Sequence, residues 1–234
     1  MRPEASPSVF DAGCRACPRL AAHLDAVRAT HPAYWARPVP MFGDPAATLL
    51  VVGLAPGMHG ANRTGRPFTG DYAGILLYRT LHAHGFANHA GSADPSDGLK
   101  LEGCRITNAV KCLPPQNKPT PAEARLCNRF LVEELRRYPP RVILALGRVA
   151  HDAVLMALGL KANACRFAHH AVHDLPNGMQ LFDSYHCSRY NTQTKRLTDA
   201  MFDAVVRDIA AHLGGSAVRP RGAASSGRAR TANV

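Results

Sequence analysis

Four of the seven cysteines in this chain of 234 residues are placed so that they could bind one inorganic centre. Cys14 and Cys17 form a C-x-x-C pair, and Pro18 follows the pair with a fixed backbone dihedral that favours a turn. Cys112 and Cys127 lie fifteen residues apart. The segment between them is rich in proline and therefore stiff, so it could bring both thiolates to one point.

Spacing alone leaves three interpretations of these cysteines. Four thiolates suit a tetrahedral zinc ion and an iron-sulfur cluster about equally well, and four buried thiols without metal are the third alternative. A disulfide framework is disfavoured, because the count is odd and residues 1–10 hold prolines and a glutamate instead of a secretory signal. We expect a cytoplasmic protein in which the remaining cysteines, Cys104, Cys165 and Cys187, pack in the core.

The elements that must position these residues follow from the apolar pattern. Four short runs rich in branched apolar side chains, at residues 48–53, 105–110, 141–147 and 179–185, predict buried strands. Apolar residues at helical spacing follow each run, and residues 9–28 predict a further helix that carries Cys14 and Cys17 near its start. This alternation indicates an α/β fold, a three-layer α/β/α sandwich with a central four-stranded parallel sheet.

Composition predicts a single basic domain. We expect it to occupy residues 1–213, followed at residues 214–234 by a disordered basic tail of Gly, Ser, Ala and Arg without periodicity. The net charge of +11 and the pI near 9.7 favour an anionic partner such as nucleic acid. No segment offers about 18 uninterrupted apolar residues, so we predict that the protein has no membrane partner. We also expect a monomer.

Three polar clusters come directly after predicted strands. The glycine-containing run at residues 54–59 follows the first strand, Asn108 lies at the end of the second, and His186 follows the fourth. In an open parallel sheet, ligands bind beyond the carboxyl ends of the strands. We therefore expect these clusters to meet at one edge of the sheet and to form a site there.

Three long motifs carry a resemblance to a known family. They are residues 53–71 (GLAPGMHGANRTGRPFTGD), 107–119 (TNAVKCLPPQNKP) and 184–198 (SYHCSRYNTQTKRLT). Over residues 9–210, the chain resembles the family 5 uracil-DNA glycosylases, the iron-sulfur members of the uracil-DNA glycosylase superfamily. The resemblance implies the fold of that superfamily and a [4Fe-4S] cluster on Cys14, Cys17, Cys112 and Cys127. It implies a DNA-repair hydrolase that cleaves the N-glycosidic bond of uracil, and we extend this to other deaminated or damaged bases such as hypoxanthine and xanthine, leaving an abasic site.

The resemblance also places Asp71, Asn108 and His186 in the active pocket and Phe68 at an aromatic stacking position. Cleavage of a glycosidic bond requires a base held outside the helical stack by a π-face and by hydrogen bonds. Asn108 can both donate to and accept from a base edge. As the bond breaks, the base gains negative charge, so we expect His186 to donate to its oxygen. Asp71 is the candidate for activating water or stabilising the cationic sugar.

The first motif predicts a tight turn over the base and sugar, because glycines let the backbone approach a ligand closely. The residues of this turn are Gly53, Ala55, Pro56 and Gly57. Residues 54–59 contain no acid, whereas some relatives in the superfamily carry a water-activating Asp or Asn there. The usual assignment of the catalytic base therefore does not transfer to this chain.

Basic and polar side chains within the same motifs predict contacts to DNA. They are Arg63, Arg66, Arg189, Tyr190, Asn191 and Lys195. Residues 187–192 are the expected wedge that fills the gap left by a flipped base. Tyr190 stands where the family often has glutamine, and we expect it to alter the preference for the opposite base.

The residues by themselves also allow a second class of function. A catalytically silent iron-sulfur protein could bind DNA or sense oxidation through its cluster. Such a protein needs no constellation of Asp71, Asn108 and His186, which favours the enzyme. No lysine is placed for Schiff-base chemistry, so the predicted enzyme is monofunctional and does not cut the strand.

Overall fold

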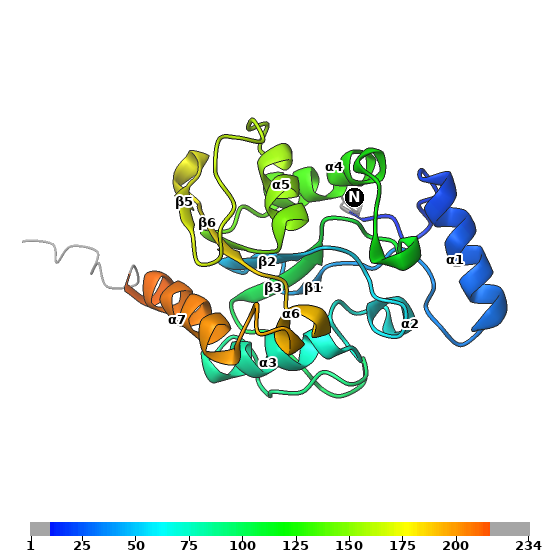
Figure 1. Cartoon of the computed structure of the whole chain (residues 1–234), viewed down its shortest axis with the longest axis horizontal. Coiled ribbons are helices and arrows are strands. Elements are labelled where there is room, and N and C mark those ends of the chain that lie inside the picture. Colours follow the sequence, from blue (N-terminus) through cyan, green and yellow to red (C-terminus); the bar gives the residue numbers. More distant parts are fainter. Residues whose placement is uncertain (1–9, 216–234) are drawn as a thin grey trace, which may run out of the picture.

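The computed structural model describes residues 10–215, which form an α/β sandwich (Figure 1). One six-stranded sheet has the strand order β1-β3-β2-β4-β6-β5. The strands are β1 (Phe42–Gly43), β2 (Leu49–Gly53), β3 (Cys104–Asn108), β4 (Val142–Leu146), β5 (Val172–Asp174) and β6 (Gln180–Ser184). The α-helices are α1 (Pro18–Thr30), α2 (Ala61–Thr64), α3 (Tyr72–Ala83), α4 (Pro121–Arg137), α5 (Arg148–Ala157), α6 (Arg189–Gln193) and α7 (Asp199–Gly215), and two 3-10 helices cover Pro115–Asn117 and Pro176–Gly178.

The four central strands β3, β2, β4 and β6 run parallel, which confirms the predicted core of the sheet. The edge strands β1 and β5 pair antiparallel with their neighbours, and neither was among the predicted strands. They span only two and three residues, which is too short for an alternating pattern to emerge. The three-layer fold is confirmed, and its sheet is mixed because of these two edges.

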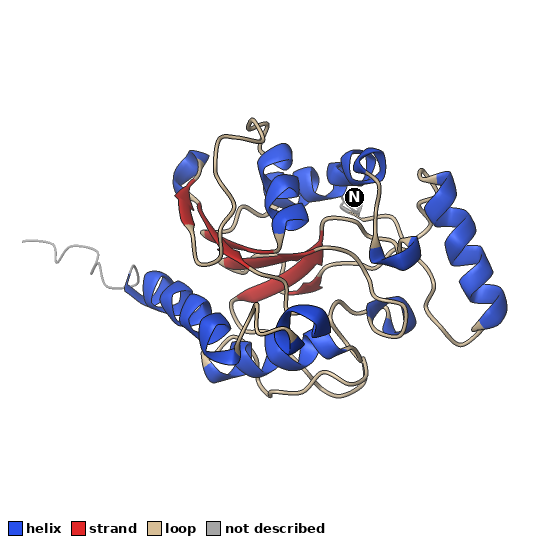
Figure 2. Ribbon diagram, in the orientation of Figure 1, coloured by secondary structure: helices blue, strands red, loops and turns tan. Residues whose placement is uncertain are grey.

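Helices cover both faces of the sheet (Figure 2). Along β2, Leu49 and Val51 join a core cluster with residues of α3 and α7, while Leu50 and Val52 join a second cluster with residues of α4 and α5. Successive strand residues point to opposite faces, so burial on both sides requires the continuous apolar runs that the sequence shows.

The N-terminal helix begins later than predicted. α1 starts at Pro18 with Cys17 as its N-cap, so Cys14 and Cys17 precede the helix instead of lying in its first turns. Proline is favoured at the first helical position, because its missing N–H has no partner to lose there and its dihedral is already helical. The extended backbone at Cys17 leaves both thiols on a loop beside the rest of the domain.

The last helix reaches beyond the predicted end of the domain. α7 includes Gly214 and Gly215, where the basic tail was expected to begin. Residues 216–234, which hold the rest of that predicted tail, lie outside the described residues. Within residues 10–215, none of the helices has the length and apolarity needed to span a bilayer.

Candidate active site and four-cysteine cavity

A pocket of about 380 Å³ opens at the carboxyl ends of the parallel strands. Its volume lies in the range typical of small-ligand sites. Its lining residues are Leu54, Ala55, Gly57, Ala61, Phe68, Asp71, Tyr72, Ala73, Asn108, Asn117, His186, Ser188 and Arg189. The structure thus brings Phe68, Asp71, Asn108 and His186 together, although they come from three separate motifs.

The aromatic wall of the pocket depends on one glycine. Phe68 is buried and has a left-handed φ of 53°, and its ring lies against Gly53 at the end of β2. A Cβ atom at Gly53 would stand 2.6 Å from the Phe68 ring and 2.4 Å from Oδ1 of Asn108. Only glycine therefore lets the ring and the amide lie side by side. The Phe68 and His186 rings are stacked at a tilt of 29° with centroids 5.9 Å apart.

Asn108 presents an unsatisfied acceptor at the pocket. It ends β3 opposite Gly53, and its Oδ1 atom is buried without a hydrogen-bond partner. A buried polar atom left unpaired costs about 1–3 kcal/mol, and most such atoms in folded proteins are paired. An N–H group on a bound ligand would satisfy this oxygen.

His186 follows β6 and lies half-buried in the pocket wall. Burial lowers the pKa of His186 to about 4, so its imidazole is neutral near pH 7. A neutral imidazole carries one N–H and can donate one hydrogen bond. The Asn191 side-chain amide donates to the His186 carbonyl oxygen at 2.9 Å, which fixes the backbone at the exit of the strand.

Asp71 has a structural contact as well as a place in the pocket. Its Oδ1 atom accepts the Gly74 N–H at 2.9 Å and caps α3. The other oxygen, Oδ2, faces the loop of the first motif, where a Cβ on Gly60 would lie only 2.3 Å away. Burial raises the pKa of Asp71, although the backbone N–H groups of Ala73 and Gly74 act in the opposite direction.

The turn over the pocket is only partly made of the residues that the sequence indicated. Ala55 and Gly57 line the pocket, whereas Gly53 lies beneath Phe68 and Pro56 is buried outside the lining. Gly74 was missed: a Cβ there would stand 1.9 Å from the Phe68 carbonyl oxygen. Its position three residues after Asp71 was the available signal, because the start of a helix carries the N–H groups that bind a capping side chain.

Arg66 was predicted to contact DNA, and the structure places its side chain inside the protein instead of on the surface. Its side chain is buried and forms a bidentate ion pair with Asp97, at 2.7 and 3.0 Å. It also donates to Thr69 Oγ1 at 2.7 Å and to the Asp94 carbonyl oxygen at 2.9 Å. The guanidinium is therefore committed to holding the loop around residues 92–97. Burial of an arginine depends on a partner acid far away in the sequence, which the local motif does not reveal.

The other predicted DNA contacts lie at or near the surface. Arg189 is exposed, lines the pocket and stacks on the Tyr72 ring with its guanidinium carbon 5.0 Å from the centroid. Tyr190 is 70% exposed and Lys195 is also exposed. Arg63 is partly buried and donates through Nε to the His59 carbonyl oxygen at 2.7 Å. Tyr72 was not among the predicted site residues, because a tyrosine at a helix start has no distinctive spacing.

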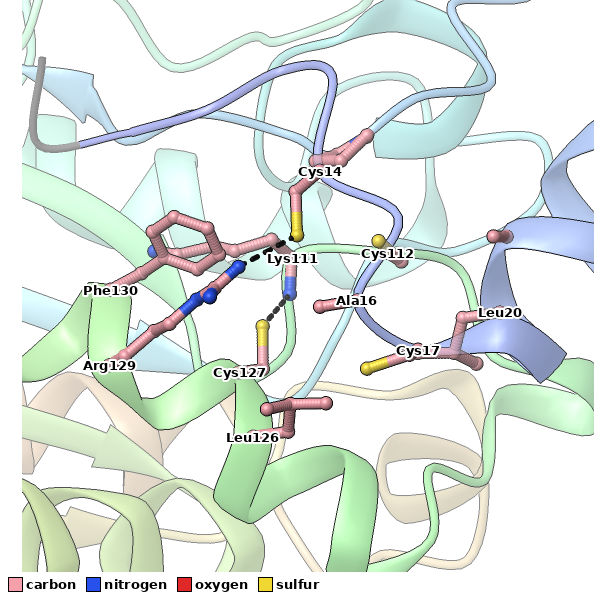
Figure 3. Close-up of a pocket in the computed structure, with 12 residues that line it drawn as sticks. Cys14, Ala16, Cys17, Leu20, Lys111, Cys112, Leu126, Cys127, Arg129 and Phe130 are labelled. Atoms are coloured by element: carbon pink, nitrogen blue, oxygen red, sulfur yellow. Dashed lines mark hydrogen bonds between the residues drawn. The ribbon is translucent and has the colours of Figure 1, made fainter.

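The four predicted ligand cysteines line one separate cavity (Figure 3). Two of the sulfur atoms accept hydrogen bonds: Cys14 from the Arg129 guanidinium at 3.1 Å, and Cys127 from the Lys111 backbone N–H at 3.2 Å. Burial, followed by the charge of the neighbouring sulfurs, raises the pKa of Cys112 to about 12. Such thiols become thiolates only when a metal centre supplies positive charge.

The spacing of the four sulfurs disfavours a single metal ion. Tetrahedral zinc with four Zn–S bonds of about 2.3 Å holds its sulfurs about 3.8 Å apart. The cysteine thiols do not lie within 4.8 Å of one another as a group, whereas His151, His173 and Asp183 do, alone among residues 10–215. This second group was not predicted, because its members have no metal-binding spacing in the sequence.

Comparison with known proteins identifies the family of the chain. A family model described as the uracil DNA glycosylase superfamily matches residues 40–210. A type-5 uracil-DNA glycosylase of Thermus thermophilus is 51% identical over 201 residues, which cover 83% of this chain and 91% of that protein. Type-5 uracil-DNA glycosylases of Mycobacterium leprae and Pyrobaculum aerophilum are 46% and 42% identical over 205 residues, covering 83% and 86% of this chain and 89% of each relative. The chain therefore belongs to the type-5 uracil-DNA glycosylases of the uracil-DNA glycosylase superfamily.

Proposed function

We propose that this protein is a monofunctional uracil-DNA glycosylase that hydrolyses the N-glycosidic bond of uracil in DNA and leaves an abasic site. The observation that carries this proposal is the unpaired Asn108 oxygen beside the Phe68 ring at the pocket. Uracil offers an N–H between two carbonyl groups on its pairing edge, so it can donate to this oxygen while its face lies on the ring. The type-5 relatives bear the name uracil-DNA glycosylase.

The pocket can promote departure of the base by electrostatics and positioning. Water adds to the sugar carbon as the glycosidic bond breaks, and the electron pair of that bond leaves with uracil. The neutral His186 imidazole donates a hydrogen bond to the base oxygen on which negative charge develops. The Asp71 carboxylate, whose Oδ2 atom faces the first-motif loop, orients the water or stabilises the cationic sugar.

The pocket favours hydrolysis without strand cleavage. A bifunctional glycosylase needs an amine that forms a Schiff base with the sugar. The lining of the pocket contains no lysine. Alkali or a separate activity would therefore be needed to cut the strand at the abasic site.

The cysteine cavity fits a [4Fe-4S] cluster held by Cys14, Cys17, Cys112 and Cys127. The donor set is all thiol, and two of its sulfurs accept N–H groups, as thiolates bound to iron commonly do. No three of these thiols lie within 4.8 Å of one another, whereas the ligands of one tetrahedral ion would. When bound, the cluster supplies a covalent tie between the N-terminal segment and α4, and the reaction needs no electron from it.

The exposed side chains beside the pocket form the proposed contact with DNA. Arg189 and Lys195 would bind phosphates, and Tyr190 would enter the gap left by the flipped nucleotide. A monomer in the cytoplasm suffices for this activity, with a glycosylase domain that extends through the end of α7 at Gly215 and a basic extension after it. Hypoxanthine and xanthine are further proposed substrates, because they too carry an N–H next to a carbonyl group.

Base release from defined duplexes tests the function directly. The protein is incubated with duplexes that contain uracil, hypoxanthine or xanthine, and abasic sites are then cleaved with alkali. Product from the uracil duplex is expected, and its absence with a fully loaded cluster would overturn the proposal. A large change in DNA affinity between the oxidised and reduced cluster, without base release, would instead favour the redox-sensing alternative.

A further inference from the structure

A cluster of two histidines and one aspartate lies apart from both sites described above. His151 comes from α5, His173 from β5 and Asp183 from β6. None of the three lines the pocket or the cysteine cavity. The Nδ1 atom of His151 lies 2.8 Å from one oxygen of Asp183, and Nε2 of His173 lies 3.1 Å from the other. His151 and Asp183 are fully buried, and the His173 side chain is 16% exposed.

The hydrogen bond of the second ring nitrogen of His151 shows that this cluster requires a positive charge. Its Nε2 atom lies 3.1 Å from the Cys165 carbonyl oxygen, which can only accept, so Nε2 carries the hydrogen. In a neutral imidazole, Nδ1 is then a lone pair that faces a carboxylate oxygen of Asp183. Two acceptors 2.8 Å apart repel each other unless a positive charge lies between them. That charge is either a proton or a metal ion.

We propose that His151, His173 and Asp183 form a second metal site that binds a divalent cation of the zinc class. One ligand atom from each residue lies within 4.8 Å of the other two. Zinc binds nitrogen and oxygen at about 2.0–2.2 Å, which places neighbouring ligands of a tetrahedral ion about 3.4 Å apart. The contacts of 2.8 and 3.1 Å need to open only slightly to admit the ion. Two imidazoles and one carboxylate are donors that zinc commonly takes.

The surroundings of the cluster also suit a metal site. A metal-bound histidine usually donates its other N–H to a backbone carbonyl or a carboxylate, as His151 does to Cys165. The ring of Phe167 stands edge-on to His151, with centroids 5.6 Å apart, and supplies an apolar neighbour. The partly exposed side of His173 gives an entry path for the ion. Three protein ligands leave one tetrahedral position for water.

The position of the cluster gives the ion a role that differs from base release. Its ligands join α5 and the edge strand β5 to β6. Asp183 stands three residues before His186 on the same chain segment. A bound ion would therefore fix the strand that leads into the pocket, from the side opposite to the pocket loops of β2 and β3.

Metal analysis of the cluster-loaded protein tests the site. The full chain is dialysed against zinc and then against metal-free buffer, and iron and zinc are counted in the same sample. We expect one zinc ion per chain in protein with a complete iron content. In a separate titration, free zinc at a hundredfold excess over its dissociation constant should raise the thermal midpoint of the protein by about 5 °C. Cobalt substitution identifies the ligands, because a cysteine site gives strong sulfur-to-cobalt charge-transfer absorption and this site should not.

Three variants separate a metal site from a structural hydrogen-bond cluster. His173→Gln should weaken zinc binding at least about tenfold, whereas the control His170→Gln, whose side chain contacts Asp208 instead, should bind normally. His173→Asp replaces the nitrogen ligand with a carboxylate oxygen, so the site keeps three ligands but gains a second negative charge beside Asp183. It should retain zinc and become strongly dependent on zinc for its thermal stability. A structural cluster would predict that this variant is destabilised with and without metal.

The proposal is overturned if the loaded protein binds no zinc outside the cysteine site, or if His173→Gln binds zinc as tightly as the wild type. A proton on His151 would then neutralise Asp183. If His173→Gln does not fold, recovery of His173→Asp by zinc decides the question. All of these readouts are independent of base release, so failure of the metal site and failure of the glycosylase proposal are distinguishable.

Discussion

At the scale of single residues, recognition and departure of the base fall to different side chains. Asn108 offers a buried, unpaired oxygen, and a donor in the ligand would satisfy it. His186 is neutral because burial lowers its pKa to about 4, so it can donate without bringing a full positive charge to the pocket. Gly53 lets Asn108 and Phe68 approach each other.

Removal of the donor at His186 should slow chemistry without unfolding the protein. His186→Ala is expected to lower the single-turnover rate of uracil release by about 10²–10³-fold, as loss of one preorganised donor does in other enzymes. Asn108→Ala should lower both the rate and the binding of the flipped base. Thermal melts and the visible absorbance of the cluster serve as folding controls. A full rate for His186→Ala would refute its assignment as the donor to the leaving base.

The ionisation of Asp71 should set the acid limb of the pH profile. Burial raises the pKa of its carboxyl group above the ordinary value of 3.8. A falling pH therefore protonates Asp71, and activity should be lost through an apparent pKa above that value. Single-turnover rates across pH measure this limb, and Asp71→Asn should be slow and lack it. An unchanged limb in the variant would assign the ionisation to another group.

At the scale of elements, the pocket depends on the first-motif loop around Phe68, which neighbouring segments hold in place. The buried Arg66 guanidinium holds the pKa of Asp97 well below its usual range and joins the first motif to residues 92–97. The hydroxyl of Tyr78 in α3 donates to the Pro67 carbonyl oxygen at 2.7 Å. These contacts hold Phe68 in its left-handed conformation between them.

Two arginine variants should separate this structural role from DNA binding. Arg66→Ala removes a buried side chain together with its ion pair to the partly exposed Asp97, and should lower the free energy of unfolding by about 2 kcal/mol. Arg189→Ala should change stability by less than about 0.5 kcal/mol, yet reduce the salt dependence of DNA binding by about one ion. Denaturant melts and binding titrations at several salt concentrations give both quantities. Equal effects of the two variants on the salt slope would restore Arg66 as a DNA contact.

At the scale of the whole molecule, the cysteine cavity joins segments that are distant in sequence. Cys14 and Cys17 precede α1, Cys112 follows β3, and Cys127 lies in α4. Arg19 in α1 reinforces this link through a bidentate ion pair with Glu123 at 2.7 and 2.8 Å. The N-terminal segment is therefore attached to the domain mainly at this end of the sheet, beside the pocket loops (Figure 1).

Loss of one ligand cysteine should affect folding and cluster binding more than the rate of base release. Cys112→Ser is expected to lower the yield of folded protein, to remove the visible absorbance and to lower the thermal midpoint. The control Cys165→Ser changes a partly exposed thiol outside the cavity and should keep all three properties. Full absorbance in Cys112→Ser would show that the cluster does not use this ligand.

The sequence by itself determined the parallel core, the polar residues Asn108 and His186 at the strand ends, and the four cysteines that line one cavity. Each of these follows from a local pattern: apolar runs for strands buried on both faces, polar residues directly after those strands, and cysteines beside a proline turn or a stiff loop. Family motifs then assigned roles to Asp71, Asn108 and His186 that the local pattern left open.

Only the tertiary structure decided the features that depend on partners far apart in the chain. It buried Arg66 against Asp97, gave one oxygen of Asp71 to the cap of α3, and added β1 and β5 at the sheet edges. It also brought His151 and His173 to the same buried carboxylate. The physical reason is shared: burial and pairing are set by the neighbours that folding supplies, and no spacing within one segment encodes them.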